Sequence, residues 1–118
     1  MVVTIHVVSA DGRLRQALRS RFGTALCGCV VATATAVGGV AAGDVVVAPA
    51  AELSVSDCAR LARDGVRVVV LAPIPRLLEE HRYSAAGARS YLPMTVDTGP
   101  LIEAVKRAAG CTAIIRPA

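Results

Sequence analysis

The chain has 118 residues, of which 54% are hydrophobic and only 3% aromatic, and its formal charge at pH 7 is +4. This length suits a single domain whose core is built from Val, Leu, Ile and Ala. No apolar run approaches the roughly 20 residues that span a bilayer, and no signal peptide precedes the first strand pattern. The basic residues are not interleaved with aromatic ones, so the charge does not indicate a nucleic-acid surface. The composition therefore predicts a cytoplasmic protein that contacts no membrane.

Strand and helix patterns alternate in chain order. Runs of β-branched residues predict strands at 2–9, 29–35, 44–48, 66–71 and 88–92. Helical spacing of apolar residues predicts helical segments at 12–22, 36–42, 55–64, 77–86 and 99–109. The segment at 36–42 contains two glycines and is expected to form two turns at most. Asp11 and Ser54 are predicted N-caps, and Gly23 and Gly110 are predicted helix ends.

This alternation predicts an α/β fold with a parallel sheet covered on both faces. The topology expected at this size is a flavodoxin-like (CheY-like) three-layer sandwich, with five parallel strands in the order 2-1-3-4-5. The run Asp44–Pro49 is expected to be central and buried on both faces. Chemistry is usually placed beyond the carboxyl end of such a strand. Here that loop offers Ala48, Pro49, Ala50 and Ala51, none of which is a nucleophile, base or ligand.

Cysteines and histidines form no recognisable site pattern. The four cysteines, predicted to be free thiols, are Cys27, Cys29, Cys58 and Cys111. The spacing of the first two is not that of a zinc site, and no second Cys/His pair completes four ligands. His6 lies inside a strand pattern and is predicted to be a hydrogen-bonded core histidine. The sequence therefore predicts no metal, no cofactor and no enzyme activity.

The stretch 85–92, which reads AAGARSYL, resembles the passage before the conserved lysine in receiver domains of bacterial response regulators. Residues 68–72 are similar to the fourth strand of that family, and 101–105 to its last helix. The resemblance covers essentially the whole chain and implies a two-component system. The ending is similar to the linker of NarL/LuxR-type regulators. It implies a receiver-like domain at 1–110 and a tail at 111–118 that leads toward a helix-turn-helix DNA-binding domain.

Family members are phosphorylated on their own Asp, which closes the third strand. An acidic pair holds Mg²⁺, and a hydroxyl and a Lys contact the phosphoryl oxygens. In this sequence the phosphoacceptor position falls on Pro49, or on Ala48 if the register slips. The remaining positions fall on Ser9 and Ala10 with Asp11 one place beyond, on Ala72 and on Met94. The switch aromatic is retained as Tyr91, and without a hydroxyl at Ala72 it is expected to keep one rotamer. The resemblance therefore implies an atypical, phosphorylation-independent receiver.

Three functions remain open for such a domain. One is a dimerisation or regulatory module of a transcriptional regulator, paired with itself or with a related response regulator. It would contact DNA only through an attached C-terminal domain. The candidate dimer surface on the first and last helices comprises Arg15, Arg19, Leu101, Ile102, Val105 and Lys106. The family also dimerises through its fourth helix, fifth strand and last helix.

The second function is sensing of a small-molecule metabolite in place of phosphate. The apolar pocket expected for it is bounded by Ser9, Asp11, Pro49, Ala72 and Met94. The third is a stand-alone protein-interaction adaptor.

Overall fold

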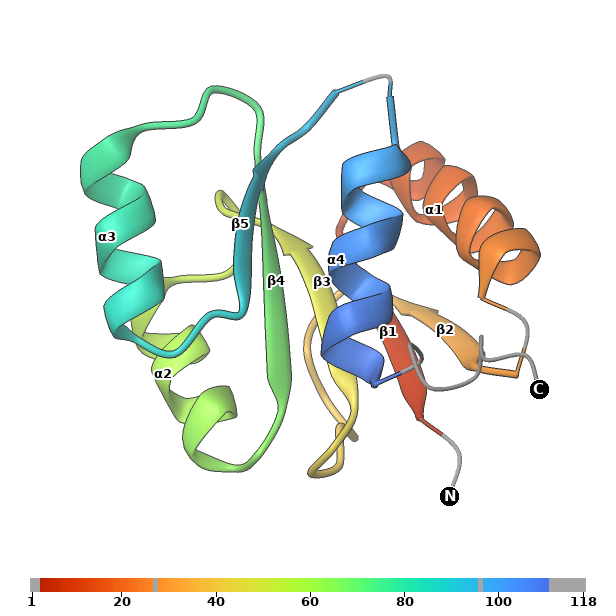
Figure 1. Cartoon of the computed structure of the whole chain (residues 1–118). Coiled ribbons are helices and arrows are strands. Elements are labelled where there is room, and N and C mark those ends of the chain that lie inside the picture. The colour runs from red at the N-terminus through yellow and green to blue at the C-terminus, as the bar shows by residue number, and fades with distance from the viewer. Residues whose placement is uncertain (1–2, 27, 96, 111–118) are drawn as a thin grey trace, which may run out of the picture.

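A computed structural model describes residues 3–26, 28–95 and 97–110 of the chain. Its five parallel strands form one sheet in the order β2-β1-β3-β4-β5. The strands are β1 (Thr4–Val8), β2 (Val30–Ala34), β3 (Val45–Pro49), β4 (Arg67–Ala72) and β5 (Ser90–Pro93). The predicted α/β class and flavodoxin-like strand order are confirmed (Figure 1).

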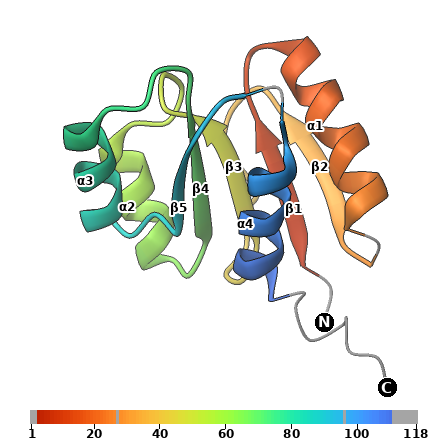
Figure 2. The same ribbon diagram turned by 45° about the horizontal axis from the view of Figure 1, so that its top comes forward.

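The helices form a layer on each face of the sheet. They are α1 (Gly12–Ala25), α2 (Val55–Arg63), α3 (Leu77–Ala85) and α4 (Gly99–Ala109). Residues of α1 and α4 share one apolar cluster with the sheet, and residues of α2 and α3 share the other. Figures 1 and 2 show α2 and α3 together on one side of the strands, with α1 and α4 on the other.

The helical segment predicted at 36–42 is wrong, because these residues form bends and turns. Gly39 and Gly43 have φ angles of 65° and 91°, left-handed values that a continuous right-handed helix does not contain. Val37 and Val40 still pack against the apolar cluster of α2 and α3. A loop therefore takes the place of the helix that was expected between β2 and β3.

The predicted helix boundaries are confirmed at three of four positions. The side chain of Asp11 accepts hydrogen bonds from N–H groups in the first turn of α1, and that of Ser54 does the same for α2. Gly110 ends α4 with a left-handed φ of 73°. The stop predicted at Gly23 is wrong, since α1 continues past it. Burial of Leu26, which is 3% exposed at the C-cap, offsets the roughly 1 kcal/mol cost of a glycine inside a helix.

Strand β3 lies at the centre of the core, as its sequence pattern predicts. All five of its residues are buried. Val45 and Val47 face the cluster of α1 and α4, while Val46 and Ala48 face that of α2 and α3. No helix among the described residues is both long enough and apolar enough to cross a membrane.

Candidate functional site

The carboxylate of Glu52 lies at the carboxyl ends of β1 and β3, where the strand order reverses; this place is called the crevice here. Ser9, which is fully buried, donates from Oγ to Glu52 Oε2 at 2.7 Å. The backbone N–H of Ala10 donates to Glu52 Oε1 at 2.5 Å. Ser9 and Ala10 are the positions at which the resemblance places an acidic pair. In this chain the hydroxyl of Ser9 and the N–H group of Ala10 bind a carboxylate from the neighbouring loop. In the family, two carboxylates at these positions would bind a cation.

The loop between β1 and α1 is held by further hydrogen bonds to Ser9. The N–H of Asp11 donates to Ser9 Oγ at 3.0 Å, and Arg15 Nη1 donates to the Ser9 carbonyl at 2.6 Å. The carboxylate of Asp11 caps α1 by accepting from Arg13 N at 2.9 Å. Asp11, the acid that follows the predicted pair in sequence, is therefore used to start a helix, and the Arg15 side chain is folded back onto the loop.

The other degenerate positions are apolar, as the sequence shows, but they do not all face this crevice. Pro49 is buried and pairs with Leu71 of β4. Ala72 is 1% exposed and accepts a hydrogen bond from Met94 N at 2.8 Å. The Met94 side chain packs against the cluster of α1 and α4. Among the described residues, no group of three or more Asp, Glu, His or Cys side chains could hold a metal ion.

Glu52 is the important residue that the sequence-based prediction missed. The loop prediction covers Ala48 to Ala51, and Glu52 lies one residue beyond it. A tight turn brings Glu52 back over the sheet, because its N–H donates to the Pro49 carbonyl at 2.9 Å. The available signal is that Glu52 is the only charged residue between β3 and α2. Its partner could not be predicted, because Ser9 lies 43 residues earlier in the chain.

Tyr91 is held against α3 by its ring and by its hydroxyl. The hydroxyl donates to the Glu79 carboxylate and accepts from Arg76 N at 3.2 Å. Its ring stacks on Tyr83 with centroids 6.0 Å apart. Burial raises the pKa of Tyr91 above its ordinary value, and the hydrogen bond to Glu79 raises it further. The aromatic of β5 is therefore tied to the start of α3.

Tyr83 connects α3 to the loop that carries Glu52. Its side chain is only 3% exposed, and its hydroxyl lies within hydrogen-bonding distance of the carbonyls of Ala50 (3.1 Å) and Leu53. Burial is the main reason that the pKa of Tyr83 is raised above its ordinary value. The loop is thus attached to the β1 end through Glu52 and to α3 through Tyr83.

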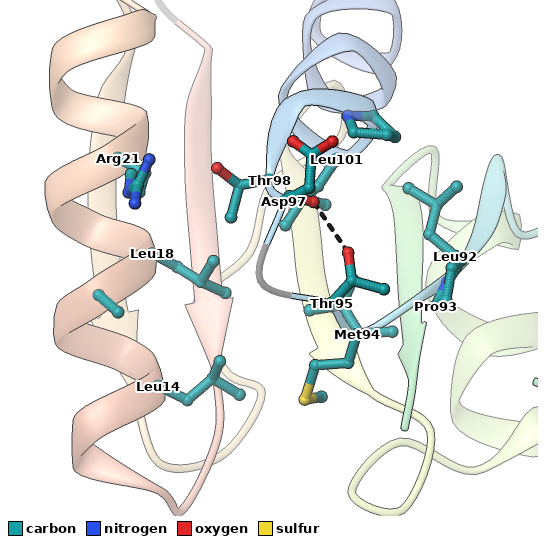
Figure 3. Close-up of a pocket in the computed structure, with 13 residues that line it drawn as sticks. Leu14, Leu18, Arg21, Leu92, Pro93, Met94, Thr95, Asp97, Thr98 and Leu101 are labelled. Atoms are coloured by element: carbon teal, nitrogen blue, oxygen red, sulfur yellow. Dashed lines mark hydrogen bonds between the residues drawn. The ribbon is translucent and has the colours of Figure 1, made fainter. Parts of the chain in front are cut away.

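A separate pocket of about 240 Å³ lies between α1 and the start of α4 (Figure 3). Its floor is made by the ends of β4 and β5. The lining residues include Leu14, Leu18, Leu71, Leu92, Met94 and Leu101, with Arg21, Asp97 and Thr98 as polar members. Of the five residues expected from the sequence to bound an apolar pocket, Met94 lines this one, whereas Ser9, Asp11, Pro49 and Ala72 do not.

The candidate dimer surface needs correction at its apolar residues. Leu101 and Val105 are 7% and 0% exposed and belong to the core of this chain, because α4 lays its apolar face on the sheet. Ile102 is half-buried against the same core, and Lys106 lies 3.7 Å from Glu103. Of the predicted residues, Arg19 is fully on the surface. Exposed apolar side chains occur instead around the start of α3, at Ile74 (71%), Leu77 (69%) and Leu78 (64%).

Neither His6 nor Cys58 lines the pocket between α1 and α4. His6 Nε2 is 3.0 Å from Asp44 Oδ2, so the predicted hydrogen-bonded histidine is confirmed and its partner is a carboxylate. Cys58 is a buried free thiol whose pKa is raised by burial. Cys27 and Cys111, like the whole predicted tail at 111–118, lie outside the described residues.

Solved structures share this fold at low sequence identity. A response regulator receiver domain protein from Clostridium thermocellum is 18% identical, with a TM-score of 0.75, over 98% of this chain and 100% of its own. The signal receiver domain of a DNA-binding response regulator from Colwellia psychrerythraea is 14% identical, with a TM-score of 0.77, over 92% and 98%. A Burkholderia pseudomallei protein described as pilus assembly-related is 20% identical, with a TM-score of 0.74, over 92% and 90%.

No protein-family model matches the sequence, and no curated protein matches it either. The likeness therefore lies in the arrangement of strands and helices rather than in the residues. The chain has the flavodoxin-like fold that these receiver domains also have.

Proposed function

We propose that this chain is an atypical receiver domain that regulates through protein–protein contact and not by accepting a phosphoryl group. The observation that carries the proposal is the Glu52 carboxylate bound to Ser9 and Ala10. An anion already occupies the crevice where phosphoryl chemistry would need a cation. The domain would have no enzyme activity and would work in the cytoplasm.

The chemistry of the crevice supports this proposal at each position. Phosphoryl transfer to a protein needs a nucleophile, Mg²⁺ held by hard oxygen ligands, and donors for the phosphoryl oxygens. Pro49 has no nucleophilic group, Ala72 has no hydroxyl, and Met94 has no charge. Asp11 is engaged as a helix cap and Glu52 is paired with two donors. The carboxylates at this end of the sheet thus have structural partners.

The first test is phosphorylation of the intact chain. Acetyl phosphate with Mg²⁺ is expected to add no phosphate by mass spectrometry, and beryllofluoride with Mg²⁺ is expected to leave the amide NMR spectrum unchanged. A receiver domain that retains the acidic pair, the Asp and the Lys serves as the positive control under the same conditions. Incorporation of a substantial fraction of one phosphate per chain would refute the proposal.

The apolar surface at the start of α3 supports a contact with a partner chain. Ile74, Leu77 and Leu78 are neighbours in sequence and all more than 60% exposed, which is costly unless another protein covers them. By position, α3 corresponds to the fourth helix through which family members dimerise. We infer that a second copy of this chain, or a related response regulator, covers this surface. DNA would be contacted only through an attached C-terminal domain.

Sedimentation across a range of protein concentrations tests the dimer. The unaltered chain should associate, and Leu77→Glu or Leu78→Glu should weaken the association at least about tenfold, since a charge would be buried without a partner. Val30→Glu is the matched control, because Val30 is 51% exposed on the edge strand β2, away from α3. A monomer at all concentrations, or a dimer weakened only by Val30→Glu, would contradict this assignment.

A stand-alone adaptor remains the alternative function. The protein described as pilus assembly-related shares the fold, so the fold occurs outside proteins that are described as response regulators. The coding sequence that follows residue 118 distinguishes the two. A helix-turn-helix there would favour the transcriptional regulator, and a stop codon would favour the adaptor.

A further inference from the structure

The pocket between α1 and α4 has the size of a small organic ligand. Its volume is about 240 Å³, and a cavity of roughly 150 Å³ lined by similar side chains holds a benzene molecule. Leu14 and Leu18 of α1 face Met94 and Leu101 across the opening in Figure 3. The interior is therefore suited to an apolar body about the size of one six-membered ring or a short branched chain.

Cationic and hydroxyl groups lie at the rim of this apolar space. Arg21 lines the pocket from α1, and among the described residues its guanidinium has no hydrogen bond or ion pair. Thr98 lies at the N-cap of α4, but its side chain makes no capping hydrogen bond. The first residues of an 11-residue helix also favour a negative charge. These groups together suit the head of an anion.

Asp97 limits how much negative charge the pocket can accept. Its carboxylate also lines the pocket, and its Oδ1 accepts a hydrogen bond from Gly99 N at 2.9 Å. That hydrogen bond uses part of the positive end of α4. One carboxylate opposite Arg21 is therefore compatible with the site, whereas a phosphate dianion would be repelled more strongly by Asp97.

We propose that the α1–α4 pocket binds a small organic acid, with its single carboxylate at Arg21 and Thr98 and its apolar body among the leucines of the interior. This site is distinct from the crevice closed by Glu52 and needs no phosphoryl chemistry. Its test is thus independent of the phosphorylation test, and either one can fail without the other.

Amide NMR titrations of the full chain with matched acids and amides test the proposal. Benzoate is compared with benzamide, and 4-methylpentanoate with 4-methylpentanamide, at pH 7. Probes of this size are expected to bind with roughly millimolar dissociation constants. Shifts should be confined to α1, the end of β5 and the start of α4. The amides should bind about tenfold more weakly, because they lack the charge that Arg21 pairs with.

Two substitutions and their controls assign the binding to this pocket. Ala17→Phe fills the space from an exposed position of α1, and Gln16→Phe places the same ring one residue away, outside the lining. Arg21→Gln removes the charge, and Arg19→Gln removes a charge from the same helix outside the pocket. Ala17→Phe should abolish acid binding, and Arg21→Gln should reduce it about tenfold with little effect on the amides.

Three outcomes would overturn the proposal. Absence of localised shifts at tens of millimolar acid would show that the pocket does not take such ligands. Equal affinities for acid and amide, unchanged by Arg21→Gln, would refute the anionic head. If acids do not bind while Ala17→Phe disrupts self-association measured by sedimentation, the pocket accepts a side chain of another protein molecule instead.

Discussion

The crevice between β1 and β3 and the pocket between α1 and α4 lie at the same end of the sheet but differ in how their polar groups are used. In the crevice, Ser9 and Ala10 are paired with Glu52 of the same chain. In the pocket, Arg21 and Thr98 have no side-chain partner among the described residues. Polar groups satisfied from within contribute to folding, whereas unpaired groups beside an apolar cavity remain available to a ligand. The polar groups of the crevice are thus paired within the chain, whereas those of the neighbouring pocket are not.

The largest expected effect is on the free energy of unfolding, and it is measured at two leucines that are each 1% exposed. One lies in a closed part of the core and the other beside the pocket. Leu53 packs in the closed cluster of α2 and α3, while Leu71 forms part of the pocket floor. Leu53→Ala should lower the free energy of unfolding by about 3–5 kcal/mol. Leu71→Ala should cost about 2–3 kcal/mol, because the space it leaves opens into the pocket and water can enter it. Urea unfolding measures both, and an equal or larger loss for Leu71→Ala would mean that the pocket is not open.

The second prediction tests the hydrogen bond between Ser9 and Glu52 at the crevice. Ser9→Ala removes the donor to Glu52 and the acceptor for Asp11 N from a fully buried position. The free energy of unfolding should fall by about 1–3 kcal/mol. Ser84→Ala on the exposed surface of α3 is the control and should change it by less than about 0.5 kcal/mol. A loss for Ser9→Ala as small as that of the control would show that Glu52 does not hold the crevice shut.

The smallest effect concerns a second internally paired carboxylate, at the amino end of β3. Burial by itself would raise the pKa of Asp44, but hydrogen bonds from His6 and from the backbone of Ala41 and Thr4 outweigh it. The pKa therefore lies below its ordinary value. A carboxyl whose pKa is lower in the folded state stabilises the fold above its unfolded pKa. That contribution is lost as the pH falls through the folded value.

Asp44→Asn should accordingly reduce the loss of stability between pH 7 and about pH 3 by up to about 1 kcal/mol. Urea unfolding of both proteins at the two pH values measures this difference. An identical acid dependence for the two proteins would show that Asp44 does not contribute to it. The comparison therefore shows whether the hydrogen bonds to the Asp44 carboxylate stabilise the folded state.

Much of the fold could be predicted from local patterns. The β-branched runs mark the strands. A strand whose two faces are both covered by helices needs apolar residues at successive positions, because neighbouring side chains point to opposite faces. The caps at Asp11, Ser54 and Gly110 follow from short-range hydrogen bonding and backbone geometry. The helix expected at 36–42 does not form: Gly39 within it and Gly43 just after it have left-handed φ angles, while Val37 and Val40 pack against the core.

The candidate site divides in the same way. The sequence by itself determined which residue types stand at these positions, since Pro49, Ala72 and Met94 carry no nucleophile, hydroxyl or charge wherever those residues lie. Only the tertiary structure decided that Glu52 fills the crevice and that Met94 turns toward the open pocket. The physical reason is range. The repeats of about two residues in strands and about four in helices depend only on residues close in sequence. The contacts of Glu52 with Ser9, and of α1 with the start of α4, form when segments far apart in the chain pack together.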